Sequence, residues 1–183
     1  MTTNTSTNNY TIDPAHSSAQ FSVRHMMISN VKGEFGKVTG SIVYDPNNLP
    51  ASKIEALIDV NSINTREPQR DAHLKSADFF DAAQFPNLTF RSTEIRTAGD
   101  GIEIRGDLTI RDVTREVVLQ VEDPVEEVKD PWGNLRIGAS ATTKLNRKDW
   151  GLVWNQVLET GGVMVGNDVK ITIDLEATRN AVA

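Results

Sequence analysis

The stretch Gly99-Asp100-Gly101-Ile102-Glu103-Ile104-Arg105-Gly106-Asp107-Leu108-Thr109-Ile110 sets the pattern for the whole chain. From Ile102 onward, apolar or small residues alternate with polar or charged ones, which is the period of a strand with one buried face. Gly99-Asp100-Gly101 separates this strand from the alternation at 88–92 by a hairpin-length turn. The segment therefore predicts an antiparallel hairpin.

The same two-residue period recurs along most of the chain. Turn residues such as Asp45-Pro46-Asn47-Asn48 keep neighbouring segments close in sequence, which favours antiparallel pairing. The pattern predicts an all-β fold of eight strands, over residues 19–25, 38–44, 54–60, 88–92, 102–110, 117–121, 135–143 and 169–175.

Eight strands in one domain must protect their edges, which a sandwich or a closed barrel does. Many positions expected to face inward are small: Ala19, Gly40, Ala56, Gly106, Ala139 and Ala141. Small inner residues leave room for a ligand inside an eight-stranded barrel, but they also accommodate close strand crossings. We prefer the cavity, and the pattern alone leaves both interpretations open.

Two segments lack the alternation. Within 62–85, a set of residues from Arg66 to Ala77 is spaced at intervals of three and four, which is the period of a helix. The spacing predicts a short helix over Glu67–Ser76, between the third and fourth strands. We expect a second helical turn over 77–83. The glycine-rich segment 146–167 carries two of the three tryptophans and is expected to be a long loop or mobile hairpin beside the sheet.

The helical segment also holds the most informative polar residues. Arg66, Arg70 and His73 share one helix face, where they could hold a phosphate or a polar head group. The alternative is a solvated face with an internal Arg–Asp pair involving Asp71. Three of the six phenylalanines follow within seven residues, at 79, 80 and 85, and core packing explains only some of them. The others could line the mouth of a tunnel.

The length of 183 residues favours one domain. We expect a disordered polar tail over 1–9, a folded domain over 10–178 and a short C-terminal tail over 179–183. The tail has no basic or apolar signal region, so cytoplasmic placement is expected, or periplasmic placement if an export signal has been removed.

The charge and composition exclude several classes of partner. The net charge of −6 makes nucleic acid or an anionic membrane surface a poor partner, because both require basic patches. No run approaches the roughly 18 apolar residues of a membrane span, so no stable membrane insertion is expected. The chain has no cysteine, which excludes disulfides and thiolate catalysis.

Motifs for catalysis or cofactor binding are absent from the sequence. His16, His25 and His73 have no metal-type spacing, and His16 is expected to hydrogen bond within the turn that follows Asp13-Pro14-Ala15. There is neither a Gly-x-Ser-x-Gly elbow nor a phosphate-binding loop. We therefore predict no catalytic residues, no metal site and no cofactor.

Several motifs, in order along the chain, resemble the YceI-like family of polyisoprenoid-binding, lipocalin-like proteins. The resemblance covers about Tyr10 to Thr178 and is most specific at the Arg-Asp-x-His-Leu segment with its Phe-Phe pair. Its motifs are Ile12-Asp13-Pro14-Ala15-His16-Ser17, Phe21-Ser22-Val23-Arg24-His25, Val31-Lys32-Gly33-Glu34-Phe35, Ser62-Ile63-Asn64-Thr65, Arg70-Asp71-Ala72-His73-Leu74-Lys75-Ser76-Ala77-Asp78-Phe79-Phe80-Asp81, Phe85-Pro86-Asn87-Leu88-Thr89-Phe90, Gly106-Asp107-Leu108-Thr109-Ile110-Arg111, Asn146-Arg147-Lys148-Asp149-Trp150-Gly151 and Val165-Gly166-Asn167-Asp168-Val169.

The resemblance implies an eight-stranded antiparallel, lipocalin-like barrel with a helix capping one side. It implies a long apolar pocket for an isoprenoid chain or a similar amphiphile, often in a homodimer, and no catalytic residues. Two features depart from the family: the usual export signal is missing, and Tyr10 stands where many members have Trp.

The leading hypothesis is a non-enzymatic protein that binds a polyprenyl phosphate, an isoprenoid quinone or a fatty-acid derivative for carriage, storage or stress response. One alternative is an enzyme acting on an isoprenoid or quinone, with His25 or His73 as acid or base. Another is a stress-related interaction module with a packed barrel. The expected ligand-binding residues are Phe21, His25, Phe35, Phe79, Phe80, Phe90, Trp150, Trp154 and Met164 along the chain of the ligand, and Arg70 and His73 at its head.

Overall fold

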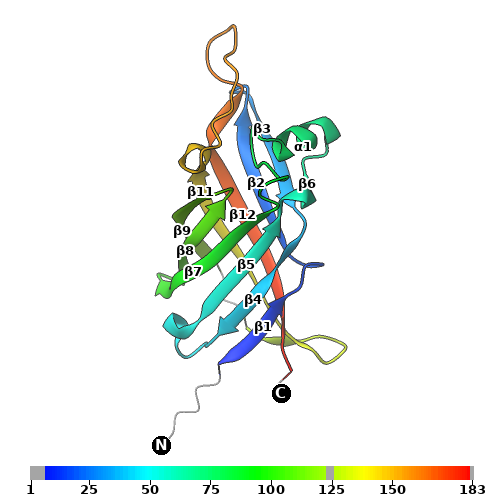
Figure 1. Cartoon of the computed structure of the whole chain (residues 1–183). Helices are drawn as coiled ribbons and strands as arrows, with labels where there is room; N and C mark the ends of the chain where they lie inside the picture. The colour runs from blue at the N-terminus through cyan, green and yellow to red at the C-terminus, as the bar shows by residue number, and fades with distance from the viewer. Residues whose placement is uncertain (1–6, 123–125, 182–183) are drawn as a thin grey trace, which may run out of the picture.

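The computed structural model describes residues 7–122 and 126–181, which form one twelve-stranded sheet with a short α-helix (Figure 1). The first half of the chain contains β1 (Asn8–Ile12), β2 (Ser18–His25), β3 (Ser29–Phe35), β4 (Val38–Tyr44), η1 (Leu49–Ala51), β5 (Lys53–Asp59), η2 (Val60–Ser62), β6 (Ile63–Asn64) and α1 (Pro68–Lys75). The second half contains β7 (Asn87–Ala98), β8 (Gly101–Ile110), β9 (Val113–Glu122), β10 (Val128–Lys129), β11 (Leu135–Asn146), η3 (Arg147–Trp150) and β12 (Val165–Arg179).

The sheet closes on itself as an eight-stranded antiparallel barrel. Around the ring the order is β11-β9-β8-β7-β5-β4-β1-β12, and β12 then pairs with β11 from Asn146↔Asp168 to Arg136↔Thr178. The barrel prediction is therefore confirmed. The sandwich, which the alternation alone had left open, is not formed.

Three positions in the barrel wall are each built from two consecutive strands. β1 and β2 lie along the same edge of β12, where β1 pairs with residues 177–179 and β2 with residues 165–174. The second position consists of β4, which pairs with β1, and β3, which pairs with β2. The third consists of β5, which pairs with β4, and β6, which pairs with β3. β10 is an extra strand that pairs only with the start of β11 in the described part of the chain.

Each predicted strand lies within or largely within an observed one, but the prediction missed β1, β3, β6 and β10. β1 has the sequence NNYTI, so Asn8 and Asn9, which we had assigned to a disordered tail, belong to a strand and pair with β4. Arg179, assigned to the C-terminal tail, likewise pairs with Tyr10. Backbone N–H and C=O groups pair with the adjacent strand whatever the side chain is, so polar residues can be held in the sheet. Residues 1–6 of the expected tail lie outside the described residues.

The predicted helix is confirmed as α1, which lies beside the barrel wall near β3 and β6 (Figure 1). Glu67 is its N-cap, and its carboxylate accepts hydrogen bonds from the backbone N–H groups of Gln69 and Arg70. The expected second helical turn over 77–83 is wrong, since this segment forms turns. Ser76 ends the helix with an extended backbone, and Asp81 has a positive φ of 50°, which a helix cannot contain. Among the described residues, no helix is long and apolar enough to cross a bilayer.

Both explanations of the small inward residues hold, at different positions. A Cβ added to Gly40 would lie 2.0 Å from the carbonyl oxygen of Glu55, and one added to Gly106 would lie 2.4 Å from the ring of Phe90. These glycines therefore permit close approach. The alanines at 19, 56, 139 and 141 instead line an interior cavity.

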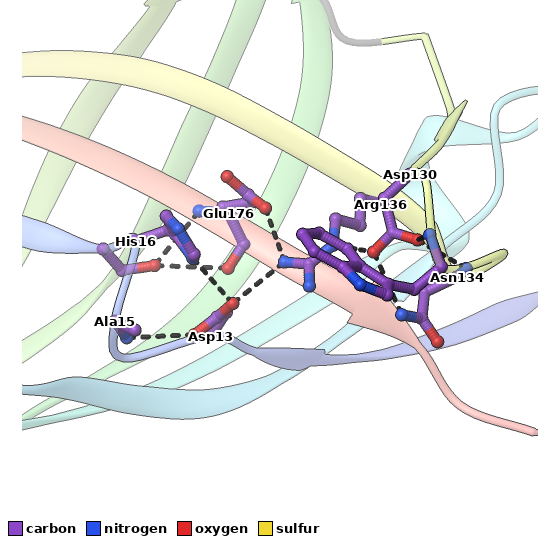
Figure 2. Close-up of polar contacts among 9 residues, drawn as sticks. Asp13, Ala15, His16, Asp130, Asn134, Arg136 and Glu176 are labelled. Atoms are coloured by element: carbon purple, nitrogen blue, oxygen red, sulfur yellow. Dashed lines mark hydrogen bonds and ion pairs between the residues drawn. The ribbon is translucent and has the colours of Figure 1, made fainter.

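A network of charged residues joins the break between β1 and β2 to β11 and β12 (Figure 2). Arg136 donates hydrogen bonds to Asp13 at 2.9 Å, to Asp130 at 2.8 Å and to Glu176 at 2.6 Å. His16 lies 2.9 Å from Asp13, so the expected role of His16 within its turn is confirmed. The network fastens the barrel at the end that lies away from the 152–164 loop (Figure 1).

Hydrogen bonds shift the pKa values within this network. Bonds from His16 and Arg136 lower the pKa of Asp13 to about 2, and the bond to Asp13 raises the pKa of His16. Burial by itself would raise the pKa of Asp130, but bonds from Asn134 and Arg136 hold it well below its usual range. These carboxylates therefore stay ionised in the folded protein at mildly acidic pH.

We predict that Asp13→Asn lowers the free energy of unfolding by about 1 kcal/mol near pH 5. The pKa of Asp13 is depressed on folding, so its contribution is present above its unfolded pKa and is lost as the pH falls through about 2. The pKa of His16 is raised, so its contribution is present below its unfolded pKa and is lost as the pH rises through its folded value. The difference between variant and wild type should therefore shrink on both sides of pH 5.

Urea unfolding from pH 2 to pH 9 measures this difference. Glu159→Gln is the control, because Glu159 is exposed in the 152–164 loop and forms no salt bridge with a described residue. A destabilisation by Asp13→Asn that is constant across this pH range would contradict the network's role.

Candidate ligand-binding site

The barrel encloses an apolar cavity of about 270 Å³. A second chamber of about 90 Å³ adjoins it and shares six wall residues with it: Ile42, Ile54, Ile104, Val121, Ala139 and Leu175. A single water needs only about 10–15 Å³, and an engineered apolar cavity of about 150 Å³ binds benzene. The interior is therefore much larger than a packing defect, and it extends along the barrel.

The wall of the larger chamber consists almost entirely of inward side chains from the barrel strands, completed by residues in and after α1 and around η3. Its polar members are Gln20, Thr143 and Arg147, and the Gln20 amide donates to Asp174. The apolar members are Ala19, Phe21, Val23, Phe35, Val38, Ile42, Ile54, Ala56, Ile58, Leu74, Phe79, Phe80, Leu88, Phe90, Ile104, Leu108, Ile110, Val117, Leu119, Val121, Ala139, Ala141, Leu145, Trp150, Leu152, Val165, Val169, Ile171, Ile173 and Leu175. Such a surface takes up an apolar chain and offers few polar partners.

Six of the eleven residues predicted to bind ligand line this chamber: Phe21, Phe35, Phe79, Phe80, Phe90 and Trp150. The ring of Phe35 packs against Phe21 at 5.7 Å and edge-on against Phe80 at 5.4 Å, which joins the barrel wall to the segment after α1. Trp150 donates its indole N–H to the carbonyl oxygen of Leu108 at 3.0 Å. The segments 79–80 and 150, distant in sequence, thus line the same chamber.

The predicted head-group residues Arg70 and His73 do not line the chamber. Arg70 donates to the side-chain and carbonyl oxygens of Thr65, both at 2.8 Å, and so fastens the loop before α1. His73 lies 2.8 Å from a carboxylate oxygen of Asp78 and packs edge-on against Phe79 and Trp154. Arg66, expected on the same helix face, precedes the helix and has a positive φ of 64°.

The remaining predicted residues lie next to the chamber without lining it. Trp154 packs on Phe79 with ring centroids 5.4 Å apart, behind the cavity wall. His25 ends β2, where it pairs with Ser29 and Val165. The carbonyl oxygen of Met164 accepts a hydrogen bond from the backbone N–H of Met26 at 2.8 Å. Ligand contacts of these residues stay a prediction.

Arg147 is a charged lining residue that the sequence did not predict. It begins η3, is only 7% exposed and lines the chamber beside Trp150 and Leu152. Burial lowers the pKa of its guanidinium, although arginine stays protonated in proteins. It falls in the segment 146–167, which was expected to be a loop, and no alternation there signals that its side chain is buried.

Asp13, His16 and Glu176 are close enough to be considered as metal ligands. The guanidinium of Arg136 already bridges both carboxylates, at 2.9 Å from Asp13 and 2.6 Å from Glu176. A cation there would be repelled by this charge and would compete for the same oxygens. These residues form an ion-pair network and do not suit a metal ion.

A closed antiparallel barrel around an apolar, ligand-sized cavity defines a lipocalin-like binding barrel. The chain matches the YceI-like domain over residues 10–177, and it therefore belongs to the YceI-like family. The resemblance seen in the motifs is confirmed.

Similar proteins agree with this assignment. A UPF0312 protein of Staphylococcus aureus is 39% identical over 168 residues, which cover 92% of this chain and 96% of the relative. The crystal structure of BcnA from Burkholderia cenocepacia matches with a TM-score of 0.76 at 23% identity, covering 91% of this chain and 99% of BcnA. A polyisoprenoid-binding domain from Saccharophagus degradans matches with a TM-score of 0.66 at 14% identity, covering 93% and 98%. At these identities the two structures support the fold.

We predict that Arg70→Ala lowers the free energy of unfolding by about 1–2 kcal/mol, because it removes two hydrogen bonds to Thr65. The affinity for a neutral apolar probe should stay unchanged, since Arg70 does not line the chamber. Thermal unfolding and fluorescence titration measure the two quantities. Gln69→Ala is the matched control, as this neighbouring side chain is exposed. A variant as stable as wild type would contradict the fastening role.

Proposed function

We propose that this protein binds a long-chain amphiphilic lipid inside the barrel and carries out no reaction on it. The observation behind the proposal is the apolar cavity that extends along the barrel. The ligands we propose are a polyprenyl phosphate, an isoprenoid quinone or a fatty-acid derivative. The polyisoprenoid-binding domain from S. degradans, which shares the fold, supports a ligand of this class.

The physical basis is the removal of the ligand chain from water. Burial of apolar surface contributes about 25 cal/mol per Å², so a long chain gains more than a short one. The closed barrel pairs its own backbone groups, which lets its inner wall be apolar without unpaired N–H or C=O groups facing the ligand. An unbranched or isoprenoid chain fits such an elongated space better than a compact polar molecule.

We also propose that the protein serves in carriage, storage or a stress response, that it forms a homodimer and that it is located in the cytoplasm.

The enzyme alternative gains no support from the site, because His25 and His73 are not among the lining residues and His73 is paired with Asp78. An acid or base must come within hydrogen-bond reach of the reacting atom.

The direct test is native mass spectrometry of gently purified protein, together with titration by the neutral fluorophore N-phenyl-1-naphthylamine. We expect a co-purified lipid, or an empty protein that takes up the fluorophore and releases it to polyprenyl or fatty-acyl ligands. A protein that is both empty and unable to take up any of these would overturn the proposal.

We predict that Ala141→Phe weakens fluorophore binding by about tenfold or more, because the new ring occupies the chamber that Ala141 lines. The matched control is Ser140→Phe, since Ser140 is the exposed neighbour on the same strand and points to the outer face. Circular dichroism checks that both variants fold. Equal binding by the two variants would place the fluorophore outside the barrel.

A further inference from the structure

Exposed apolar side chains gather at the end of the barrel where the 152–164 loop protrudes (Figure 1). The turn between β2 and β3 lies beside this loop, because the backbone N–H of Met26 donates to the carbonyl oxygen of Met164 at 2.8 Å. We call residues 26–28 and 152–164 together the apolar tip. Its exposed large apolar residues are Met26, Met27, Ile28, Val153 and Val157. A cluster of this kind at one end of a molecule indicates a surface for an apolar partner.

The turn at 26–28 has a backbone that does not suit the residues it contains. The N–H of Ile28 donates to the carbonyl oxygen of His25 at 3.1 Å, which closes the turn. Its two central residues both have positive φ, 47° at Met26 and 62° at Met27. Turns of this form favour Asn-Gly, because a left-handed backbone crowds a larger side chain. Two exposed methionines gain little within the protein to offset this strain, so an external partner explains them better.

The apolar tip carries little charge. The whole chain is 24% charged, whereas residues 152–164 contain one charged residue, Glu159, and residues 26–28 contain none. A bilayer of zwitterionic lipids matches such a surface, since binding at its interface grows with the apolar area that is buried. An anionic bilayer would repel a protein with a net charge of −6. The charge distribution therefore favours a neutral lipid layer.

The shape of the tip separates a bilayer from a second copy of the chain. The 152–164 loop projects beyond the strands of the barrel (Figure 1). A stable protein–protein interface takes about 20–30 residues from each side, many more than the five exposed apolar residues of the tip. A fluid lipid layer needs no complementary partner surface, because its molecules move aside for a narrow projection. Flexible methionine side chains adapt readily to such an environment.

We propose that the apolar tip docks this protein reversibly on the surface of a neutral phospholipid bilayer. The larger chamber reaches this end of the barrel, since Leu152 and Val165 at the two ends of the loop line it. Docking thus brings this end of the chamber to a lipid layer from which its ligand can be drawn. The choice of partner rests on the proposed lipid binding, whereas docking is measured separately from binding inside the barrel.

Sedimentation with sucrose-loaded vesicles of dioleoylphosphatidylcholine tests the docking. We expect wild type to sediment with the vesicles and the double variant Met27→Ser/Ile28→Ser to bind about tenfold or more weakly, because apolar area is lost. Trp132→Ser is the matched control, since Trp132 is 82% exposed but lies at the opposite end of the barrel. Failure of wild type to bind, or an equal loss of binding in Trp132→Ser, would overturn the inference.

A second variant keeps the test independent of folding. Met26→Asn/Met27→Gly places the favoured turn residues at the two positions with positive φ. Thermal unfolding should show it to be at least as stable as wild type, while its vesicle binding should fall about tenfold. A variant that binds vesicles as tightly as wild type would contradict the role of the tip.

A site-specific label tests which part of the protein enters the lipid layer. The chain has no cysteine, so Val157→Cys takes a single nitrobenzoxadiazole label, and Trp132→Cys carries the same label as the control. On the vesicles the emission of the label at 157 should shift to the blue, and that of the label at 132 should stay constant. The opposite pattern would overturn the inference.

Two further measurements separate the alternatives. Sedimentation velocity compares wild type with Met27→Ser/Ile28→Ser. A wild-type dimer that ignores vesicles and that this variant dissociates would assign the tip to a second copy of the chain and overturn the inference. Uptake of N-phenyl-1-naphthylamine is measured without vesicles. Intact vesicle binding with no uptake of this fluorophore or of lipid would support docking and refute the proposed function.

Discussion

The pairing of β12 with β11 is the interaction on which the rest of the structure depends. It extends from Asn146↔Asp168 to Arg136↔Thr178 and turns an open sheet into a barrel. Closure pairs the backbone groups that an open edge would expose. Closure also fixes the width of the barrel interior. The inward side chains do not fill this interior, since alanines line it at 19, 56, 139 and 141. The apolar cavity is thus a direct consequence of closure combined with small inner residues.

The two ends of the barrel are built by different chemistry. At the end where β1 lies in Figure 1, Arg136 joins carboxylates from the β1–β2 break, the β10–β11 turn and β12. At the other end, Phe79 packs on Trp154, which lies in the loop held by Arg147. Ion pairs within the protein hold the first end together, and apolar side chains form the wall near the second end.

The positions that the sequence predicted well are those governed by local physics. The alternation at 102–110 and 169–175 marked β8 and β12, and the three- and four-residue spacing from Arg66 to Ala77 marked α1. β1 was missed because its alternation is short, with only Tyr10 and Ile12 facing the core, and because it is held by its neighbours β4 and β12. The phenylalanines at 79 and 80 were expected at the cavity, where they lie, whereas Arg70 bonds to Thr65, a partner that spacing alone could not reveal.

The sequence by itself determined an all-β chain whose inward stripes contain many small residues, and its motifs resemble those of a family of binding barrels. Only the tertiary structure decided which small residues line a cavity and which, like Gly40 and Gly106, permit strands and rings to approach closely. Only it showed that Arg147 is buried beside the cavity and donates to backbone carbonyl oxygens. The physical reason is that periodicity reports which face a residue occupies, while burial, partners and electrostatic balance depend on segments far apart in the chain.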